Sequence, residues 1–182
     1  GAAYSAQELS YTKMLGQLQD AGNTTTLAHY LGLLGKAGML CGLPKYDPKP
    51  VTRRKSSPRL MVFDTALMTA PSGIGRMVYE SDPARRGHLV ESAVGARLLA
   101  RAPEEGFELF WWREGTSEVD FVASRNGALS AIEVKGGGES RQSGMGEFLA
   151  RHPKAKRIVV GGSSAGAYTL DDFLRDRVPL FF

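Results

Sequence analysis

One short stretch constrains the fold of this chain more than any other. Residues 117–138 read SEVDFVASRNGALSAIEVKGGG, two β-type segments separated by Asn126-Gly127. Asn-Gly between such segments is the strongest short-range signal for a two-residue hairpin turn. If Arg125 pairs with Ala128, paired residue numbers sum to 253, and Asp120 lies opposite Glu133. The sequence therefore predicts a β-hairpin that holds two carboxylates side by side.

The predicted register gives the hairpin two chemically different faces. One face is apolar and formed by two pairs, Val119 with Val134 and Phe121 with Ile132. The other face carries Glu118 opposite Lys135, an ion match, and Asp120 opposite Glu133. The last pair brings two carboxylates to roughly 5 Å at Cβ, which destabilises a sheet unless a proton or a cation lies between them.

A divalent cation is one explanation for the paired carboxylates. Asp120, Glu133 and the backbone carbonyl of Val134 form a hard oxygen set that suits Mg²⁺ or Mn²⁺. Lys135 shares a face with Glu133, where its ammonium could position a water or stabilise a pentacovalent phosphate. The alternative is structural: Asp120 and Glu133 share a proton or reach solvent in different directions, and Glu118 and Lys135 form a plain salt bridge.

The rest of the second half predicts an α-β-β-β-α-β order. Asp82-Pro83 is a helix start, and Gly87, Glu91 and Gly95 share one ridge of the helix that follows. Each interior glycine costs about 1 kcal/mol relative to alanine, so we expect a close approach to a sheet there. Strands are predicted over 107–113, 117–124, 128–135 and 156–162, the last one buried and parallel to its neighbour. Of Trp111 and Trp112, one is expected in the core and the other at the surface.

The first half has the outline of an incomplete winged helix-turn-helix. Helical spacing covers 8–19 and 24–38, and apolar segments 39–46 and 59–64 flank a basic segment, Lys45 to Arg59, with six basic residues and one acid. We expect the start of the second helix to face a nucleic-acid groove and the loop tip to contact phosphates; these residues are Thr24, Thr25, Thr26, His29, Arg53, Arg54 and Lys55. In the alternative, the helices form a packing or dimerisation unit, and the threonines only cap a helix. A helix normally precedes these two, so we expect an excised fragment of a longer chain.

Composition sets the broad class. The 182 residues are 42% hydrophobic, enough for one core with or without a small module, and the net charge of +4 permits an acidic partner. The chain has no apolar run near the ~20 residues needed to cross a bilayer, and residues 1–10 lack signal-peptide features. A single cysteine, Cys41, excludes an internal disulfide. A cytoplasmic protein with no membrane partner is expected.

The ordered motifs resemble a known family. YTKMLGQLQDAGNTTTLAHYLGLLGKAGML, SPRLMVFDTALM, GHLVESAV, EVDFVAS and AIEVKGG, taken together, resemble the C-terminal domain of unknown function in prokaryotic AAA-family ATPases. This resemblance implies a restriction-endonuclease-like fold with a PD-(D/E)xK motif, in which Val119 stands at the proline position. It assigns Asp120 and Glu133 to metal ligation, Lys135 to transition-state stabilisation or water activation, and Glu91 to an accessory acid.

The resemblance also implies a division of the chain. We expect a partial winged helix-turn-helix over 1–70, a linker over 71–82 and the restriction-endonuclease-like domain over 83–182, with a homo-oligomer as an open option. GLLGKAG has two residues where a P-loop needs four, so ATP would bind only in the missing ATPase module. The predicted function is Mg²⁺- or Mn²⁺-dependent hydrolysis of DNA. The alternative is a catalytically inactive module that recognises nucleic acid or a partner protein for the ATPase.

Overall fold

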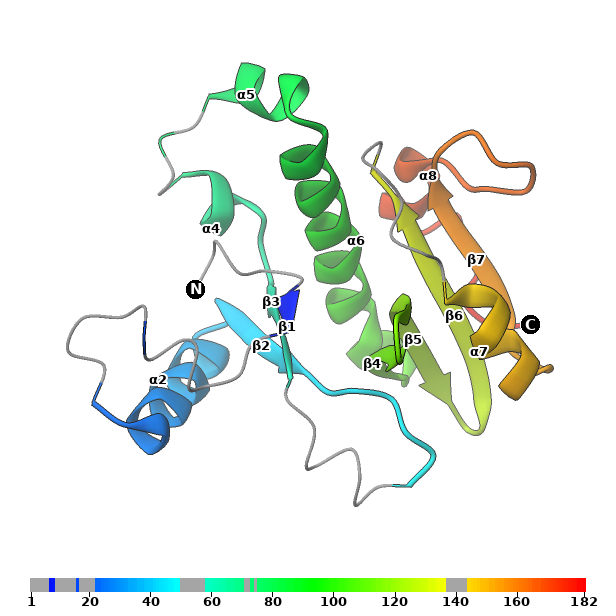
Figure 1. Cartoon of the computed structure of the whole chain (residues 1–182), viewed down its shortest axis with the longest axis horizontal. Helices are drawn as coiled ribbons and strands as arrows, with labels where there is room; N and C mark the ends of the chain where they lie inside the picture. Colours follow the sequence, from blue (N-terminus) through cyan, green and yellow to red (C-terminus); the bar gives the residue numbers. More distant parts are fainter. Residues whose placement is uncertain are drawn as a thin grey trace.

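The chain forms a mixed α/β structure with two separate sheets (Figure 1). The computed structural model describes residues 7–8, 16, 22–49, 58–70, 73, 75–136 and 144–182. The smaller sheet has the order β1-β3-β2, with β1 (Gln7–Glu8), β2 (Leu40–Leu43) and β3 (Arg59–Val62). The larger sheet has the order β4-β5-β6-β7, with β4 (Glu108–Glu114), β5 (Ser117–Arg125), β6 (Ala128–Lys135) and β7 (Lys156–Gly161). The predicted α/β class is confirmed.

The second half follows the predicted order of elements. The order is α6 (Pro83–Glu105), β4, β5, β6, α7 (Met145–Arg151), β7 and α8 (Leu170–Leu174). Asp82 begins α6 as expected, because its Oδ1 accepts the backbone N–H groups of Ala84 and Arg85 at 3.0 and 3.1 Å. β7 pairs in parallel with β6, and its central residues are buried, as predicted. No helix in the described part of the chain is long and apolar enough to cross a membrane.

The first half contains the predicted second helix, α2 (Thr24–Lys36), which lies against the smaller sheet. Asn23 caps it by accepting the Thr26 N–H at 3.0 Å. Gly38, just past its end, has a φ of +68°, a conformation that glycine adopts without strain. Tyr30 of α2 is 53% exposed, because α2 packs on the sheet through the narrower stripe of Leu27, Leu31 and Leu34.

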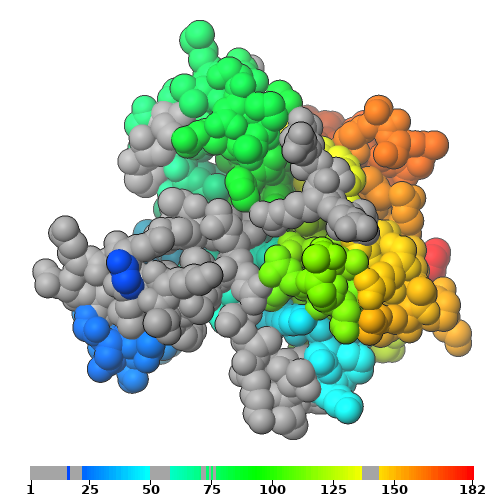
Figure 2. Space-filling model, viewed as in Figure 1, coloured from blue at the N-terminus to red at the C-terminus, as the bar shows by residue number. Residues whose placement is uncertain are grey.

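The predicted first helix is only partly described. Glu8, its expected first residue, pairs with Arg59 in β1 instead, because the small sheet recruits it as an edge strand. The rest of 8–19, apart from residue 16, lies outside the described residues. After β3 the chain forms two short helices, α4 (Ala66–Thr69) and α5 (Arg76–Ser81), before α6. In Figure 1 and in the space-filling view of Figure 2, α2 lies at the opposite side of the molecule from α7 and β7.

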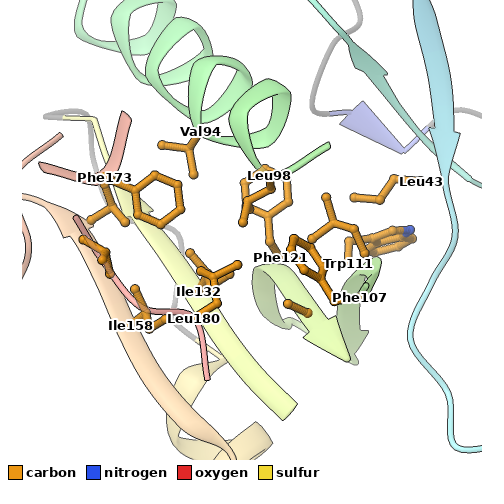
Figure 3. Close-up of a cluster of buried hydrophobic side chains, with 14 of the residues drawn as sticks. Leu43, Val94, Leu98, Phe107, Trp111, Phe121, Ile132, Ile158, Phe173 and Leu180 are labelled. Atoms are coloured by element: carbon orange, nitrogen blue, oxygen red, sulfur yellow. The ribbon is translucent and has the colours of Figure 1, made fainter. Parts of the chain in front are cut away.

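One hydrophobic core joins both sheets. On one face of the larger sheet, Val94 and Leu98 of α6 pack against Phe121 and Ile132 (Figure 3). Leu43 of β2 and Met61 of β3 enter the same cluster, so the small sheet is part of this core. Met145 and Phe148 of α7 cover the opposite face. The division into two domains stays a prediction, but the two parts share buried side chains.

The glycine ridge of α6 explains how closely these layers approach. A Cβ on Gly95 would lie 2.8 Å from Cζ of Phe121 and would also overlap the Met61 side chain. Nearer the start of the helix, a Cβ on Gly136, just after β6, would lie 2.5 Å from the Cα of Gly87. The predicted close approach of α6 to a sheet is therefore confirmed.

The two tryptophans differ from the expectation. Trp111 and Trp112 are both buried, at 1% and 4% exposure, in clusters on opposite faces of the larger sheet. The prediction of one surface indole is wrong because α7 covers the face that was expected to meet solvent. Trp112 packs edge-to-face on Phe148 of α7, with ring centroids 5.3 Å apart.

Candidate functional site

The turn of the central hairpin sets the predicted register. Asn126 and Gly127 both have positive φ, +50° and +83°, as a type I′ turn requires. The β5–β6 pairs run from Arg125–Ala128 to Phe121–Ile132, and each pair sums to 253. The register is confirmed over this range. It ends one residue before Asp120 and Glu133, so these two residues lie where the ladder stops.

A β-bulge explains why the ladder stops there. Phe110 pairs with Val122 and Trp112 with Val119, so the single residue between them on β4 faces two residues on β5, Asp120 and Phe121. A bulge interrupts the alternation of side chains. Val119 therefore lies in the cluster under α7, whereas Phe121 lies in the cluster under α6. The predicted single apolar face containing both residues is wrong.

Asp120 binds the backbone of β6 with its side chain. Its Oδ2 accepts the Val134 N–H at 2.8 Å, and Oδ1 has no hydrogen-bond partner among the described residues. Burial raises the pKa of the Asp120 carboxyl from 3.8 to about 6. The Val134 N–H and the charge of Arg59 lower this pKa, whereas the charges of Glu133 and Glu118 raise it further. Asp120 is thus a carboxylate held in an environment that disfavours its negative charge.

Glu133 and Lys135 lie together at the end of β6. Lys135 Nζ contacts Oε1 of Glu133, whose side chain is 9% exposed. Gly161, the last residue of β7, and Gly162 after it fit closely around Lys135. A Cβ on Gly161 would lie 2.5 Å from the carbonyl oxygen of Lys135, and a Cβ on Gly162 would lie 3.1 Å from the Cβ of Lys135. The backbone that carries the predicted catalytic lysine is therefore closely packed.

Two arginines that sequence reasoning did not assign to the site bind its remaining acids. Arg59 of β3 is 1% exposed, and its Nη1 lies 3.2 Å from Oε1 of Glu91 while its Nη2 contacts Oε1 of Glu118. Arg113 binds the other oxygen of Glu118, with Nε at 3.0 Å and Nη2 at 2.7 Å. Lys135 was the predicted partner of Glu118, and that pair stays a prediction. The structure shows two arginine partners of Glu118 and a contact of Lys135 with the carboxylate of Glu133.

The oxygen donors suit a hard divalent cation, but they are few. Among the described residues, no three His, Cys, Asp or Glu side chains gather as a metal-binding group. A site here would rest on Asp120, Glu133 and a backbone carbonyl such as that of Val134, with waters completing the shell. The donor set fits Mg²⁺ or Mn²⁺, because a cation near Oδ1 of Asp120 would compensate a carboxylate that burial disfavours.

The residues predicted to contact nucleic acid lie apart from this site. Thr24, Thr25 and His29 are exposed on α2, across the small sheet from β5 and β6 (Figure 1). Thr26 is partly buried, and its Oγ1 donates to Oδ1 of Asn23, the residue that caps α2, at 3.2 Å. The other three predicted contacts, Arg53, Arg54 and Lys55, lie outside the described residues.

Comparison with known families matched the chain in two parts. A family model described as a domain of unknown function, DUF8612, matches residues 1–77. Neither the curated proteins nor the solved structures include a match to the chain. A second model, DUF4143, also described as a domain of unknown function, matches residues 86–179, which contain α6, the central hairpin and β7. This match covers just over half of the 182 residues, and the chain belongs to the DUF4143 family.

Proposed function

We propose that the end of the β5–β6 hairpin is a divalent-metal site for phosphodiester hydrolysis. The observation that carries this proposal is the convergence of Asp120, Glu133 and Lys135 where the ladder stops. Asp120 and Glu133, with the carbonyl of Val134, would hold Mg²⁺ or Mn²⁺. The ion would act as a Lewis acid and neutralise charge on the phosphate.

The chain's own residues have separable roles in this proposal. The Val134 N–H fixes one oxygen of Asp120 and leaves the other for a ligand. Lys135 is the nearest candidate to stabilise charge that develops on a phosphate oxygen, because its ammonium already contacts a carboxylate of the site. Above a pH of about 6 Asp120 is mostly ionised, so the carboxylates can bind a cation at neutral pH.

The wider setting of the site also belongs to the proposal. The order of elements in 83–182 supports a restriction-endonuclease-like core, and helix α2 followed by the β2–β3 pair supports a partial winged helix-turn-helix. DNA is the proposed substrate, and a C-terminal position beside an AAA-family ATPase module is the proposed context. The basic residues of the segment Lys45 to Arg59 other than Arg59, which is buried, would supply the charge for phosphate contacts.

A second candidate is favoured by a specific observation. Glu91 and Glu118 are already bound by arginines, so part of the acidic cluster is a self-contained ion network. A non-catalytic module that binds nucleic acid or a partner protein would need no more than this. The two candidates differ in whether Asp120 and Lys135 matter for turnover.

Cleavage of DNA tests the first candidate. The purified protein is incubated with supercoiled plasmid and end-labelled duplexes in Mn²⁺, next to Asp120→Asn and Lys135→Met. We expect each substitution to lower the cleavage rate by about 100-fold or more, as removal of a charge-stabilising group does. Glu108→Gln is the matched control, because Glu108 is an exposed carboxylate paired with Ser124, further along β5 from the site. Cleavage that persists at the wild-type rate in both site variants would refute the proposed active site.

Metal binding is tested separately by calorimetric titration with Mn²⁺. We expect binding to the wild type and to Glu108→Gln, and loss of binding in Asp120→Asn. Binding of duplex DNA in EDTA, measured by fluorescence anisotropy at two salt concentrations, supports the second candidate if it is retained in Asp120→Asn and the wild type does not cleave DNA in Mn²⁺. A wild type that binds no Mn²⁺ at millimolar concentration would remove the metal site and leave a shared proton as the explanation for the paired acids.

A further inference from the structure

Arg59 lies outside the hairpin, but its buried guanidinium group contacts the acidic residues next to the hairpin's end. It lies in β3, the central strand of the small sheet, where its backbone pairs with Glu8 on one side and Leu43 on the other. Its side chain is 1% exposed and reaches Glu91 of α6 and Glu118 of β5. The small sheet therefore contributes a charge to a site that the larger sheet and α6 otherwise form.

The guanidinium is held in one position by its surroundings. Its Cζ lies over the Trp111 ring, 4.8 Å from the ring centre, which is a cation–π contact. Two of its nitrogens bind carboxylates from two different elements, whereas Nε has no hydrogen-bond partner in the part of the chain that the structure describes. Displacing a buried charge with these contacts is costly, because two carboxylates would each lose a charged partner in a low-dielectric environment.

Arg59 binds Glu91 and Glu118, the two carboxylates that would otherwise be ligands for a second metal ion. Glu118 has one oxygen on Arg59 and the other on Arg113, and Glu91 has one oxygen on Arg59. Asp120 and Glu133 are bound differently, by a backbone N–H and by a lysine. Of the four carboxylates, Glu91 and Glu118 are bound by a buried arginine, whereas Asp120 and Glu133 are the two that the proposed metal site uses.

We propose that Arg59 is a positioning residue that takes the place of a second cation, so that the site binds one divalent ion, at Asp120 and Glu133. This inference rests on the proposed metal site. Glu91 then serves to hold Arg59 and is not a metal ligand. The small sheet becomes part of the site, because without β3 the guanidinium would be missing.

The test is the stoichiometry of Mn²⁺ binding to the full chain, measured by calorimetry with electron paramagnetic resonance of free Mn²⁺ as a second readout. We expect one ion for the wild type, one ion with unchanged affinity for Glu91→Gln, and one ion for Arg59→Lys, which keeps the charge. Arg59→Met keeps much of the side-chain volume without the charge, and we expect it to bind two ions. Adding Glu91→Gln to Arg59→Met should return the count to one.

Several outcomes would overturn this inference while leaving the proposed function intact. Two ions in the wild type, or weaker binding in Glu91→Gln, would make Glu91 a ligand. A folded Arg59→Met variant that still binds one ion would reduce Arg59 to a structural residue. If Arg59→Met does not fold, the wild type and Glu91→Gln still decide the question. Absence of any Mn²⁺ binding to the wild type would overturn the proposed function and this inference together.

Discussion

Replacing Asp120 with asparagine should stabilise the metal-free protein, although Asp120 is central to the proposed site. Asparagine keeps an oxygen that can accept the Val134 N–H, and it removes the buried negative charge beside Glu133. Functional sites often hold groups that destabilise the fold. The substitution therefore separates the destabilisation of the fold by the buried carboxylate from the role of that carboxylate in metal binding.

The magnitude follows from the pKa of Asp120. Moving a carboxyl pKa from 3.8 to about 6 corresponds to about 3 kcal/mol at pH values above both. The folded state binds its proton more tightly than the unfolded chain, so this contribution lowers the free energy of unfolding as pH rises from about 4 to about 6. About 3 kcal/mol is therefore the upper limit for the gain in free energy of unfolding on Asp120→Asn, because Asp120 keeps some exposure to solvent.

The assay is urea unfolding in EDTA, followed by tryptophan fluorescence at pH 4.5 and pH 7.5. Trp111 and Trp112 are both buried, so their emission reports loss of the core. We expect Asp120→Asn to exceed the wild type at pH 7.5 and the difference to shrink at pH 4.5. Glu108→Gln is the control, because it removes the charge of an exposed carboxylate, whereas Asp120→Asn removes that of a carboxylate disfavoured by burial.

Two results would contradict this reasoning. A variant less stable than the wild type at pH 7.5 would mean that attraction to Arg59 outweighs the cost of burial. A difference that does not change with pH would mean that the effect comes from packing and not from the charge. Saturating Mn²⁺ should stabilise the wild type but not Asp120→Asn, because a ligand that binds only the folded state raises its stability.

Two further predictions concern packing and buried charge, and both are measured by thermal or urea unfolding. Gly95→Ala should lower the free energy of unfolding by about 1–3 kcal/mol, because its Cβ would lie 2.8 Å from the Phe121 ring. Gly87→Ala is the matched control. Because its Cβ would meet open space, it should raise the free energy of unfolding by up to about 1 kcal/mol. Equal effects at the two glycines would refute the tight contact. Arg101→Met should lower the free energy of unfolding by about 2–4 kcal/mol, because the 5% exposed arginine donates to the Val178 carbonyl at 3.1 Å and binds Glu105. Arg175→Met removes an exposed ion pair and should change stability little. A similar loss of stability in both variants would contradict this prediction.

Elements whose ends are set by local chemistry were predictable from the sequence. Asp82-Pro83 fixes the start of α6, and Asn126-Gly127 fixes the hairpin turn and its register, because both act within a few residues of themselves. The same turn indicated that Asp120 and Glu133 lie near each other, and the pKa of Asp120 reflects the charge of Glu133. The candidate metal ligands were therefore found from a single local signal.

The β-bulge in β5 was not predictable in the same way. Nothing in residues 117–125 distinguishes a regular strand from one with an extra residue at Asp120, since the shift is defined by pairing with Trp112 on the neighbouring strand. One extra residue moved Val119 to the face under α7 and ended the regular ladder before Asp120. Burial of Trp112 was missed for a related reason, because it depends on α7, which follows more than thirty residues later.

Arg59 shows most clearly which part of the site could not be predicted from the sequence. It is 32 residues from Glu91 and 59 from Glu118 in sequence, and it is the last basic residue of a segment that composition alone presents as one solvated charge run. A charge run carries no information about which member will meet a buried acid, because that depends on the packing of three distant elements. Since the charge of Arg59 is already taken by two carboxylates, the six basic residues of that segment overstate the positive charge that it can offer to a phosphate backbone. Any contact of this segment with DNA must therefore come from its other members, and the buried arginine belongs to the acidic site.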